Sequence, residues 1–305
     1  MASQRDVKNR ISSVKNIQKI TRAMEMVAGA RLRRAEQRIQ ALRPYADALR
    51  RMTRQAAKAA GAEATRLPLL AEHESTSKVG LLLVTGDRGL AGGFNSQIIR
   101  AGVRAGDDYA EDGVQTAWYA TGRRGVSSLT FRGRELSGSY TGFADKPAYV
   151  DARSIADDLM TGYIDGELDR VEIIYNAYVS PLTQHVTRET LLPLSRATIA
   201  AEDDDEERRA RESSGGSGHR ALVAYEPDPE EILKRLVPDY VEISIYRALV
   251  ESTAGFFGAQ MTAMRSASDN AGEIITDLTL QMNRARQAEI TQEIMEVVAG
   301  AEGLT

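Results

Sequence analysis

The chain has 305 residues, of which 42% are apolar, 27% are charged and none is cysteine. The lack of cysteine excludes a disulfide scaffold, a thiol nucleophile and a Cys-ligated zinc or iron–sulfur centre. Three histidines, His73, His185 and His219, are too few and too scattered for a multi-histidine metal site. No apolar run approaches the roughly 20 residues of a membrane-spanning helix.

The formal net charge of −4 conceals a strong asymmetry along the chain. Residues 1–60 hold fifteen Lys/Arg and four Asp/Glu, a net charge of +11, which leaves −15 for the remainder. A basic, amphipathic start is also typical of an organellar transit peptide, but here the helical periodicity continues far beyond the length of a presequence. We therefore interpret this segment as part of the mature fold.

The N-terminal segment, residues 1–60, is predicted to form one long helix. Between Ile11 and Leu49 the apolar and small residues recur at steps of three or four, which is the spacing of one helical face. The positions that define this face are Thr21, Met24, Ala28, Leu32, Ala35, Ile39, Leu42, Ala46 and Leu49.

The C-terminal segment, residues 230–305, is predicted to form a second long helix. Its heptad pattern uses Met, Ala and Ser where a stable dimeric zipper would use Ile and Leu. The pattern comprises Met261, Met264, Ser268, Ala271, Ile275, Leu278, Met282 and Ala285. Because each helix alone would expose an apolar face to water, we expect the two chain ends to pair as an antiparallel coiled coil.

Between these helices the apolar period changes. Residues 79–85 and 171–175 are typical of buried strands, 114–120 and 185–191 alternate like half-buried strands, and 96–109 and 154–165 are helical. This alternation predicts a small α/β domain over 78–199 with a largely parallel sheet. Residues 200–229, with an acidic run followed by Gly and Ser, have the composition of a loop insert that buries no core.

A glycine-rich stretch, Gly86–Asn95, follows the first strand and precedes a helix, which is where α/β proteins bind phosphate. It matches neither G-x-G-x-x-G nor the P-loop pattern, and no P-loop lysine follows. A nucleotide-binding enzyme that uses this stretch stays an alternative. We favour a structural turn whose glycines supply positive φ angles and whose charged side chains pair locally or with a partner. This turn comprises Gly86, Asp87, Arg88, Gly89, Gly92 and Gly93.

The basic N-terminal helix leaves a second alternative open, a coiled-coil protein that binds nucleic acid through clustered Lys and Arg. Tyr45 is the only aromatic residue in the segment, and the basic residues lie around much of the helix, which favours a solvated or protein-facing surface instead. The carboxylate pairs Asp107/Asp108 and Asp157/Asp158 have no histidine or ligand pattern beside them. The residues therefore favour a mechanical or scaffolding protein over an enzyme.

Three blocks of sequence resemble the gamma subunit of the rotary ATP synthase family. They are RISSVKNIQKITRAMEMVA at 10–28, GDRGLAGGFN at 86–95, and SDNAG at 268–272 with RARQAEITQEIMEVVAGA at 284–301. The blocks occur in the family's order and span nearly the whole chain.

The resemblance implies a central stalk that couples proton flow to ATP synthesis or hydrolysis and has no active site of its own. Its implied partners are the alternating catalytic (beta) and non-catalytic (alpha) subunits, the epsilon subunit and the membrane c-ring. ATP, ADP and Mg would be bound by the partner subunits, with no cofactor, metal or nucleic acid on this chain. A start at the family motif favours a peripheral protein on the cytoplasmic face of a bacterial plasma membrane.

The resemblance also implies two contact regions with the catalytic subunits. Lys19, Arg22 and Met24 correspond to the bearing near an acidic lever of the catalytic subunit. The polar catch with a catalytic-subunit loop would comprise Arg286, Gln287, Thr291 and Glu293. The 200–229 insert lies outside the family's usual pattern and is either a spacer or a contact that biases rotation.

Overall fold

The computed structural model describes residues 4–61, 66–194 and 228–302. Two compact units are present: Met1–Ala30 with Gln260–Thr305, and Arg31–Ala259. The predicted insert at 200–229 falls almost entirely outside the described residues. Among the described helices, none is long and apolar enough to cross a membrane.

The first unit consists of two helical segments that pair side by side. They belong to α1 (Gln4–Ala60) and α7 (Pro229–Glu302). Arg265 Nε lies 2.8 Å from Glu25 Oε1, and Gln18 Nε2 donates a hydrogen bond of 3.2 Å to the carbonyl oxygen of Ser268. Because partners later in α1 meet residues earlier in α7, the helices are antiparallel. The predicted antiparallel coiled coil is confirmed.

Small residues set the close approach of this pair. Ala28 and Ala271 are buried, and the Cα of Gly29 lies so near α7 that an added Cβ would sit 3.4 Å from the sulfur of Met261. At Gly272 an added Cβ would lie 3.2 Å from Gln18 Nε2. Side chains without bulk therefore allow the two helices to pack closely, as the Met/Ala/Ser pattern indicated.

The second unit contains a five-stranded sheet. The strands are β1 (Lys78–Val84), β2 (Gln115–Thr121), β3 (Leu136–Tyr140), β4 (Arg170–Tyr178) and β5 (Gln184–Leu192), in the order β3-β2-β1-β4-β5. All neighbours are parallel except β4 and β5, which are antiparallel. The largely parallel sheet is thus confirmed, and six of the seven β1 residues are buried, as expected when both sheet faces are covered.

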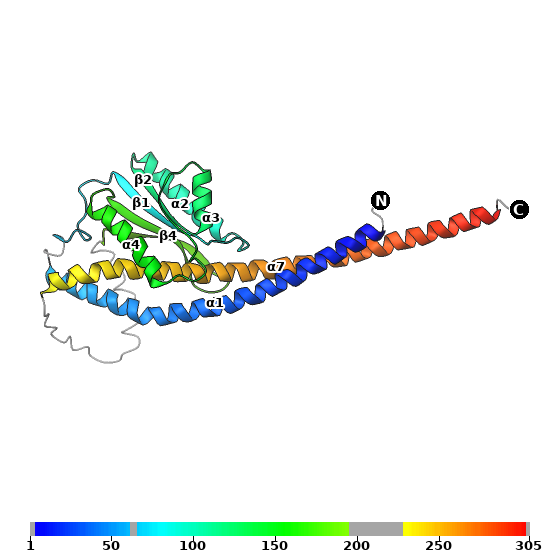
Figure 1. The fold of residues 1–305 in the computed structure, drawn as a ribbon, viewed down its shortest axis with the longest axis horizontal. Helices are drawn as coiled ribbons and strands as arrows, with labels where there is room; N and C mark the ends of the chain where they lie inside the picture. The colour runs from blue at the N-terminus through cyan, green and yellow to red at the C-terminus, as the bar shows by residue number, and fades with distance from the viewer. Residues whose placement is uncertain (1–3, 62–65, 195–227, 303–305) are drawn as a thin grey trace. The chain divides into compact units, whose positions relative to one another are not determined.

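Helices cover both faces of this sheet (Figure 1). On one face, α2 (Phe94–Glu111) approaches β1 and β2, where Gly102 faces Leu83 and Gly106 faces Trp118. The helix α3 (Arg123–Phe131) follows β2. The opposite face holds the main apolar core, which combines β1, β2, β4 and β5 with α4 (Tyr149–Ile164) and with part of α7.

The contribution of α7 to the sheet core is a finding that the heptad pattern did not indicate. Leu233, Val237, Val241, Ile245 and Leu249 lie in the same apolar cluster as the α4 and strand residues. The first turns of α7 therefore pack against the sheet, and the same stretch also meets α1, where Ile243 contacts Ala46 and Leu49. Sequence analysis also missed α3 and β3, because both are short and polar.

Candidate functional site

The turn after β1 lies where the strand order reverses. β1 continues through α2 to β2 on one side, while its other neighbour, β4, comes later in the chain. In open α/β sheets the crevice at the carboxyl ends of such strands is the usual ligand site. Gly86–Asn95 occupies this position, so its geometry decides whether a nucleotide could bind.

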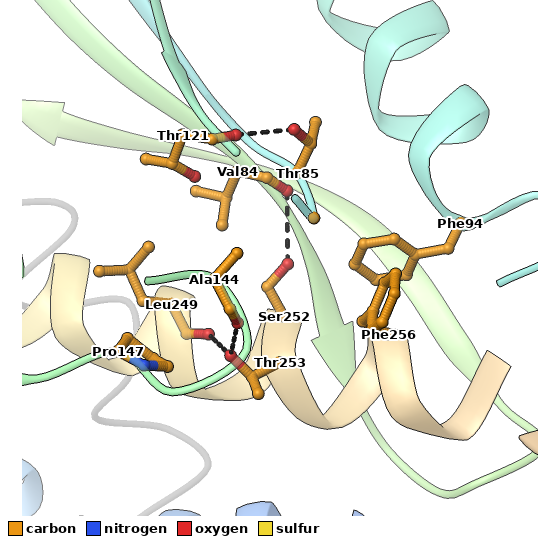
Figure 2. A pocket seen from close by; sticks show the side chains of 11 residues that line it. Val84, Thr85, Phe94, Thr121, Ala144, Pro147, Leu249, Ser252, Thr253 and Phe256 are labelled. Carbon is orange, nitrogen blue, oxygen red and sulfur yellow. Dashed lines mark hydrogen bonds between the residues drawn. The ribbon is translucent and has the colours of Figure 1, made fainter. Parts of the chain in front are cut away.

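Side chains fill that crevice (Figure 2). Phe94 from the turn meets Phe256 from α7 edge to face, with 5.6 Å between ring centroids. The Ser252 hydroxyl points to the carbonyl oxygen of Val84 at 3.3 Å. The remaining cavity is about 10 Å³, which is room for about one water molecule. This arrangement gives the nucleotide-enzyme alternative no support.

Asp87 holds the turn together by accepting backbone hydrogen bonds from two other loops. Its carboxylate accepts N–H bonds from Arg123, Gly142 and Ala144, each at 3.1 Å. These donors begin α3 and form the loop between β3 and α4. The acidic side chain therefore joins three segments that leave the carboxyl ends of neighbouring strands.

Asn95 closes the turn internally. Its Oδ1 accepts a hydrogen bond of 2.8 Å from the Gly86 N–H, and its Nδ2 donates one of 3.1 Å to the Arg88 carbonyl oxygen. Arg88 lies 3.5 Å from Asp145, in the loop between β3 and α4. The charged residues of this turn are thus engaged within the second unit.

The expectation that glycines supply the positive φ angles is wrong for most of the turn. Gly92 has φ of +55°, but the other such residue between Gly86 and Gly93 is Leu90, at +64°. Gly86 is instead needed for close approach, because an added Cβ would lie 2.9 Å from the buried Phe256 ring. At Gly89 an added Cβ would lie 2.7 Å from the guanidinium of Arg124, an exposed side chain that can move aside. Gly93 starts α2 with φ of −83°.

A network of charges ties β4 and β5 to α7 in the same unit. Arg247 Nη2 lies 2.8 Å from Glu189 Oε2, and the Tyr175 hydroxyl donates to Glu189 Oε1 at 2.8 Å. Burial raises the pKa of the nearby Glu251 carboxyl, although Arg247 partly offsets this effect. In the described parts of the chain, no three His, Asp or Glu side chains are placed to hold a metal ion.

The residues assigned to the bearing all lie in the N-terminal part of α1. Lys19 and Arg22 are exposed, while Met24 is half-buried one residue before Glu25, which pairs with Arg265. Thr21 is buried, and its hydroxyl donates to the Gln18 carbonyl oxygen at 3.0 Å. The two cations are therefore free to meet a partner.

The residues assigned to the catch lie near the end of α7. Arg286, Gln287, Thr291 and Glu293 are exposed. The Thr291 hydroxyl donates to the Gln287 carbonyl oxygen at 2.8 Å, within the same helix. Because Arg286 follows Arg265 by about 20 residues, the two assigned groups are separated by about 30 Å along α7. They form two surfaces rather than one site.

Sequence analysis missed an exposed apolar face on the same part of α7. The side chains of Ile290, Ile294, Val297 and Val298 are 47–72% exposed and recur at steps of four, three and one. Their spacing places them on one side of the helix. The antiparallel pairing explains why these side chains are exposed. Glu25 lies opposite Arg265, and α1 extends only about 21 residues further back, to Gln4, so it ends opposite about residue 286 of α7. An exposed apolar face that no other described helix covers is typical of a protein-interaction surface.

Comparison with known proteins identifies the family. The family model described as ATP synthase matches residues 3–304. The gamma chain of Rubrobacter xylanophilus ATP synthase is 43% identical over 304 residues, covering 100% of this chain and 99% of that one. The chain belongs to the ATP synthase gamma chain family. The gamma chain of Moorella thermoacetica is 42% identical over the full length of both chains.

Solved structures of two mitochondrial ATP synthases contain chains with the same fold. A chain in the central stalk and c-ring structure of the Tetrahymena thermophila mitochondrial ATP synthase aligns with a TM-score of 0.59 and 23% identity, covering 82% of this chain and 99% of that chain. A chain of the Euglena gracilis mitochondrial enzyme aligns with a TM-score of 0.67 and 15% identity, covering 99% and 94%. The fold of this chain is thus found in chains of both complexes.

Proposed function

We propose that this gamma chain is the central-stalk rotor of a bacterial ATP synthase, coupling transmembrane proton flow to ATP synthesis and hydrolysis. Full-length similarity to bacterial gamma chains supports this proposal most directly. The antiparallel pair of α1 and α7, with its exposed apolar end, has the features of an axle inside a sleeve of other subunits.

The proposed mechanism is coupling by differential contact. An axle that presents a different face to each of three equivalent catalytic subunits makes their nucleotide affinities unequal, and rotation exchanges those roles. To move one catalytic site from 1:99 to 99:1 between two states, the axle must discriminate between them by about 5.5 kcal/mol. A surface ion pair contributes at most about 1 kcal/mol, so several contacts must act together.

Two sets of contacts are candidates for this discrimination. The exposed cations Lys19 and Arg22, together with Met24, would meet the acidic lever of a catalytic (beta) subunit. Near the end of α7, the polar catch would add hydrogen bonds from Arg286 and Gln287, beside the apolar face at Ile290 and Ile294. Thr291 and Glu293 would complete the catch.

In this proposal the chain has no active site of its own, and ATP, ADP and Mg are bound by the catalytic and non-catalytic (alpha) subunits. The filled crevice after β1 supports this division of roles. Further proposed partners are the epsilon subunit and the membrane c-ring. The complex would hold the chain peripherally at the cytoplasmic face of the plasma membrane.

Purification of the tagged chain from gently solubilised membranes of its own cell tests the proposal. We expect one copy with three catalytic and three non-catalytic subunits, together with ATPase activity. The rotor assignment would be refuted if the chain were recovered alone or with nucleic acid, while an intact ATP synthase without this chain were recovered from the same membranes.

A further inference from the structure

A cationic groove lies in the second unit between α1 and the loop that joins β3 to α4. It is lined by Arg31, Arg34 and Arg38 of α1 and by Lys146 of the loop, around a cavity of about 240 Å³. The three arginines are spaced by three and four residues, which places them on one helix face. The cationic groove therefore combines side chains more than 100 positions apart in the chain.

The charges of the groove are not balanced. Asp145 is the one carboxylate among its lining residues, and it is shared between Arg31 at 3.1 Å and Arg88 at 3.5 Å. The side chains of Arg34, Arg38 and Lys146 form no hydrogen bond or ion pair with any residue in the described ranges. Three like charges around one cavity repel each other, and a bound anion would relieve this repulsion.

The walls of the groove are held in place by buried and partly buried contacts. The Arg31 guanidinium lies over the Phe257 ring, 5.5 Å from its centroid, while Asp145 fixes the other side of that guanidinium. Ala35 and Phe257 are each 2% exposed. Thr253 anchors the loop, because its hydroxyl donates to the Ala144 carbonyl oxygen at 2.9 Å. An anion would thus meet walls that are already in place, lined by cations whose side chains can adjust to it.

We propose that the cationic groove binds a phosphate-bearing anion through Arg34, Arg38 and Lys146. Guanidinium groups present paired N–H donors that match phosphate oxygens, and lysine adds a mobile point charge. A volume of about 240 Å³ is below the roughly 300–1,000 Å³ of pockets for drug-sized ligands, so it suits one or two phosphate groups. This binding site goes beyond the rotor function proposed above.

Calorimetric titration of the purified full-length chain with inorganic phosphate, pyrophosphate and ADP, without Mg, tests the proposal at low and at physiological salt. We expect saturable binding of pyrophosphate that weakens with salt, as between partly exposed charges. ADP binding as tight as pyrophosphate, in competition with it, would support recognition of the phosphates alone. ADP binding at least tenfold tighter would support a nucleoside diphosphate as the ligand.

The decisive variant is Arg34→Gln/Arg38→Gln/Lys146→Gln, compared with Arg33→Gln/Arg51→Gln/Arg100→Gln. Both lose three positive charges, but the residues of the second set are exposed and lie outside the groove. We expect pyrophosphate affinity to fall at least about tenfold more in the groove variant, since charge-assisted hydrogen bonds are lost there. Circular dichroism melting of both variants checks that they fold.

Two results would overturn the proposal. One is equal pyrophosphate affinity in the two folded variants, which would show that pyrophosphate binding depends only on the net charge of the chain and not on the groove. The other is binding of a hexaglutamate peptide to the groove of the wild-type chain with no binding of phosphate or pyrophosphate. In that case an acidic protein segment, rather than a phosphate-bearing anion, would be the ligand.

Discussion

The side-chain amide of Gln18 donates a hydrogen bond of 3.2 Å to the carbonyl oxygen of Ser268, 250 positions later in the chain. This bond crosses the seam between α1 and α7, where an added Cβ on Gly272 would also contact Gln18. The helices approach closely enough for a side chain of one to reach the backbone of the other. Bulk inserted into this seam should therefore separate them.

Ala28→Leu is expected to lower the free energy of unfolding of the full-length chain by about 1–3 kcal/mol, because Ala28 is fully buried and the seam has no room for a larger side chain. Denaturant unfolding followed by circular dichroism measures the effect. Ala23→Leu is the matched control, since Ala23 is exposed on the same helix. Equal stability of the two variants would show that the seam is loosely packed.

Gly122→Ala is expected to destabilise the chain more than Gly133→Ala. Both glycines have positive φ, at +82° and +71°, so both substitutions strain the backbone by about 1–3 kcal/mol. The strain is greater at Gly122, because its ψ of 140° brings it near the region that essentially only glycine adopts. At Gly122 an added Cβ would also overlap the carbonyl oxygen of Thr85, whereas at Gly133 nothing lies within 4 Å. Thermal unfolding of the two variants measures the combined effect of this overlap and of the rarer backbone conformation of Gly122. Similar melting temperatures would contradict the close approach of Gly122 to β1.

Asp169→Asn is expected to destabilise the chain at pH 7, and this effect decreases only as the pH falls below about 4 toward the pKa of the folded state. Burial raises the pKa of the Asp169 carboxyl, but hydrogen bonds from His73, Ser77 and Lys78 lower it further, so the net pKa lies well below its usual range. A carboxyl whose pKa is lower in the folded state stabilises the fold above its unfolded pKa of about 3.9. That stabilisation is lost as the pH falls.

The free energies of unfolding of wild type and Asp169→Asn at pH 7 and pH 3.5 measure this difference. We expect about 1–2 kcal/mol at pH 7, since the side chains are near solvent, and only a slightly smaller value at pH 3.5, where the folded-state carboxyl is still ionised. Asp108→Asn serves as a control, because Asp108 is exposed on α2. If Asp169→Asn lowered the free energy of unfolding more at acid pH than at pH 7, the Asp169 carboxylate would not stabilise the fold through a lowered pKa.

Arg286→Ala/Gln287→Ala is expected to reduce coupled ATP synthesis about fivefold while the complex assembles at normal yield. The estimate assumes a net loss of about 1 kcal/mol of polar contact with a catalytic subunit. Synthesis by membrane vesicles, normalised to complex content, is the measurement. Gln281→Ala/Arg284→Ala removes similar exposed side chains one turn earlier and is the control. Unchanged synthesis at normal yield would remove both residues from the proposed catch.

Lys19→Gln/Arg22→Gln is expected to weaken coupling and to make it less sensitive to salt, because the proposed partner surface is acidic. Both side chains are exposed, as are those of Lys8 and Arg10, so Lys8→Gln/Arg10→Gln is a control with the same change of charge. Proton pumping by vesicles at several salt concentrations measures the effect. Indifference of pumping to the first pair of substitutions would exclude the electrostatic contact.

Sequence analysis could predict the elements whose apolar pattern is long and regular. The seams of α1 and α7 recur over many turns, and each must be covered, so the antiparallel pair followed from the sequence alone. The continuous apolar run of β1 indicated a strand buried on both faces. The three family blocks added the gamma-chain fold, because they are local strings of residues that do not depend on tertiary contacts.

Only the tertiary structure revealed the features that depend on contacts between segments far apart in the chain. The strand order, the packing of Leu233–Leu249 against the sheet and the bonds from Asp87 to two distant loops all join segments that are far apart in the chain. The positive φ of Leu90, next to Gly89, which has none, is likewise a feature of the folded turn that its residue types did not indicate. Periodicity encodes which face of an element is apolar, but packing of the whole chain decides what that face meets. The cationic groove, with Arg34 and Lys146 on separate elements, exists for the same reason.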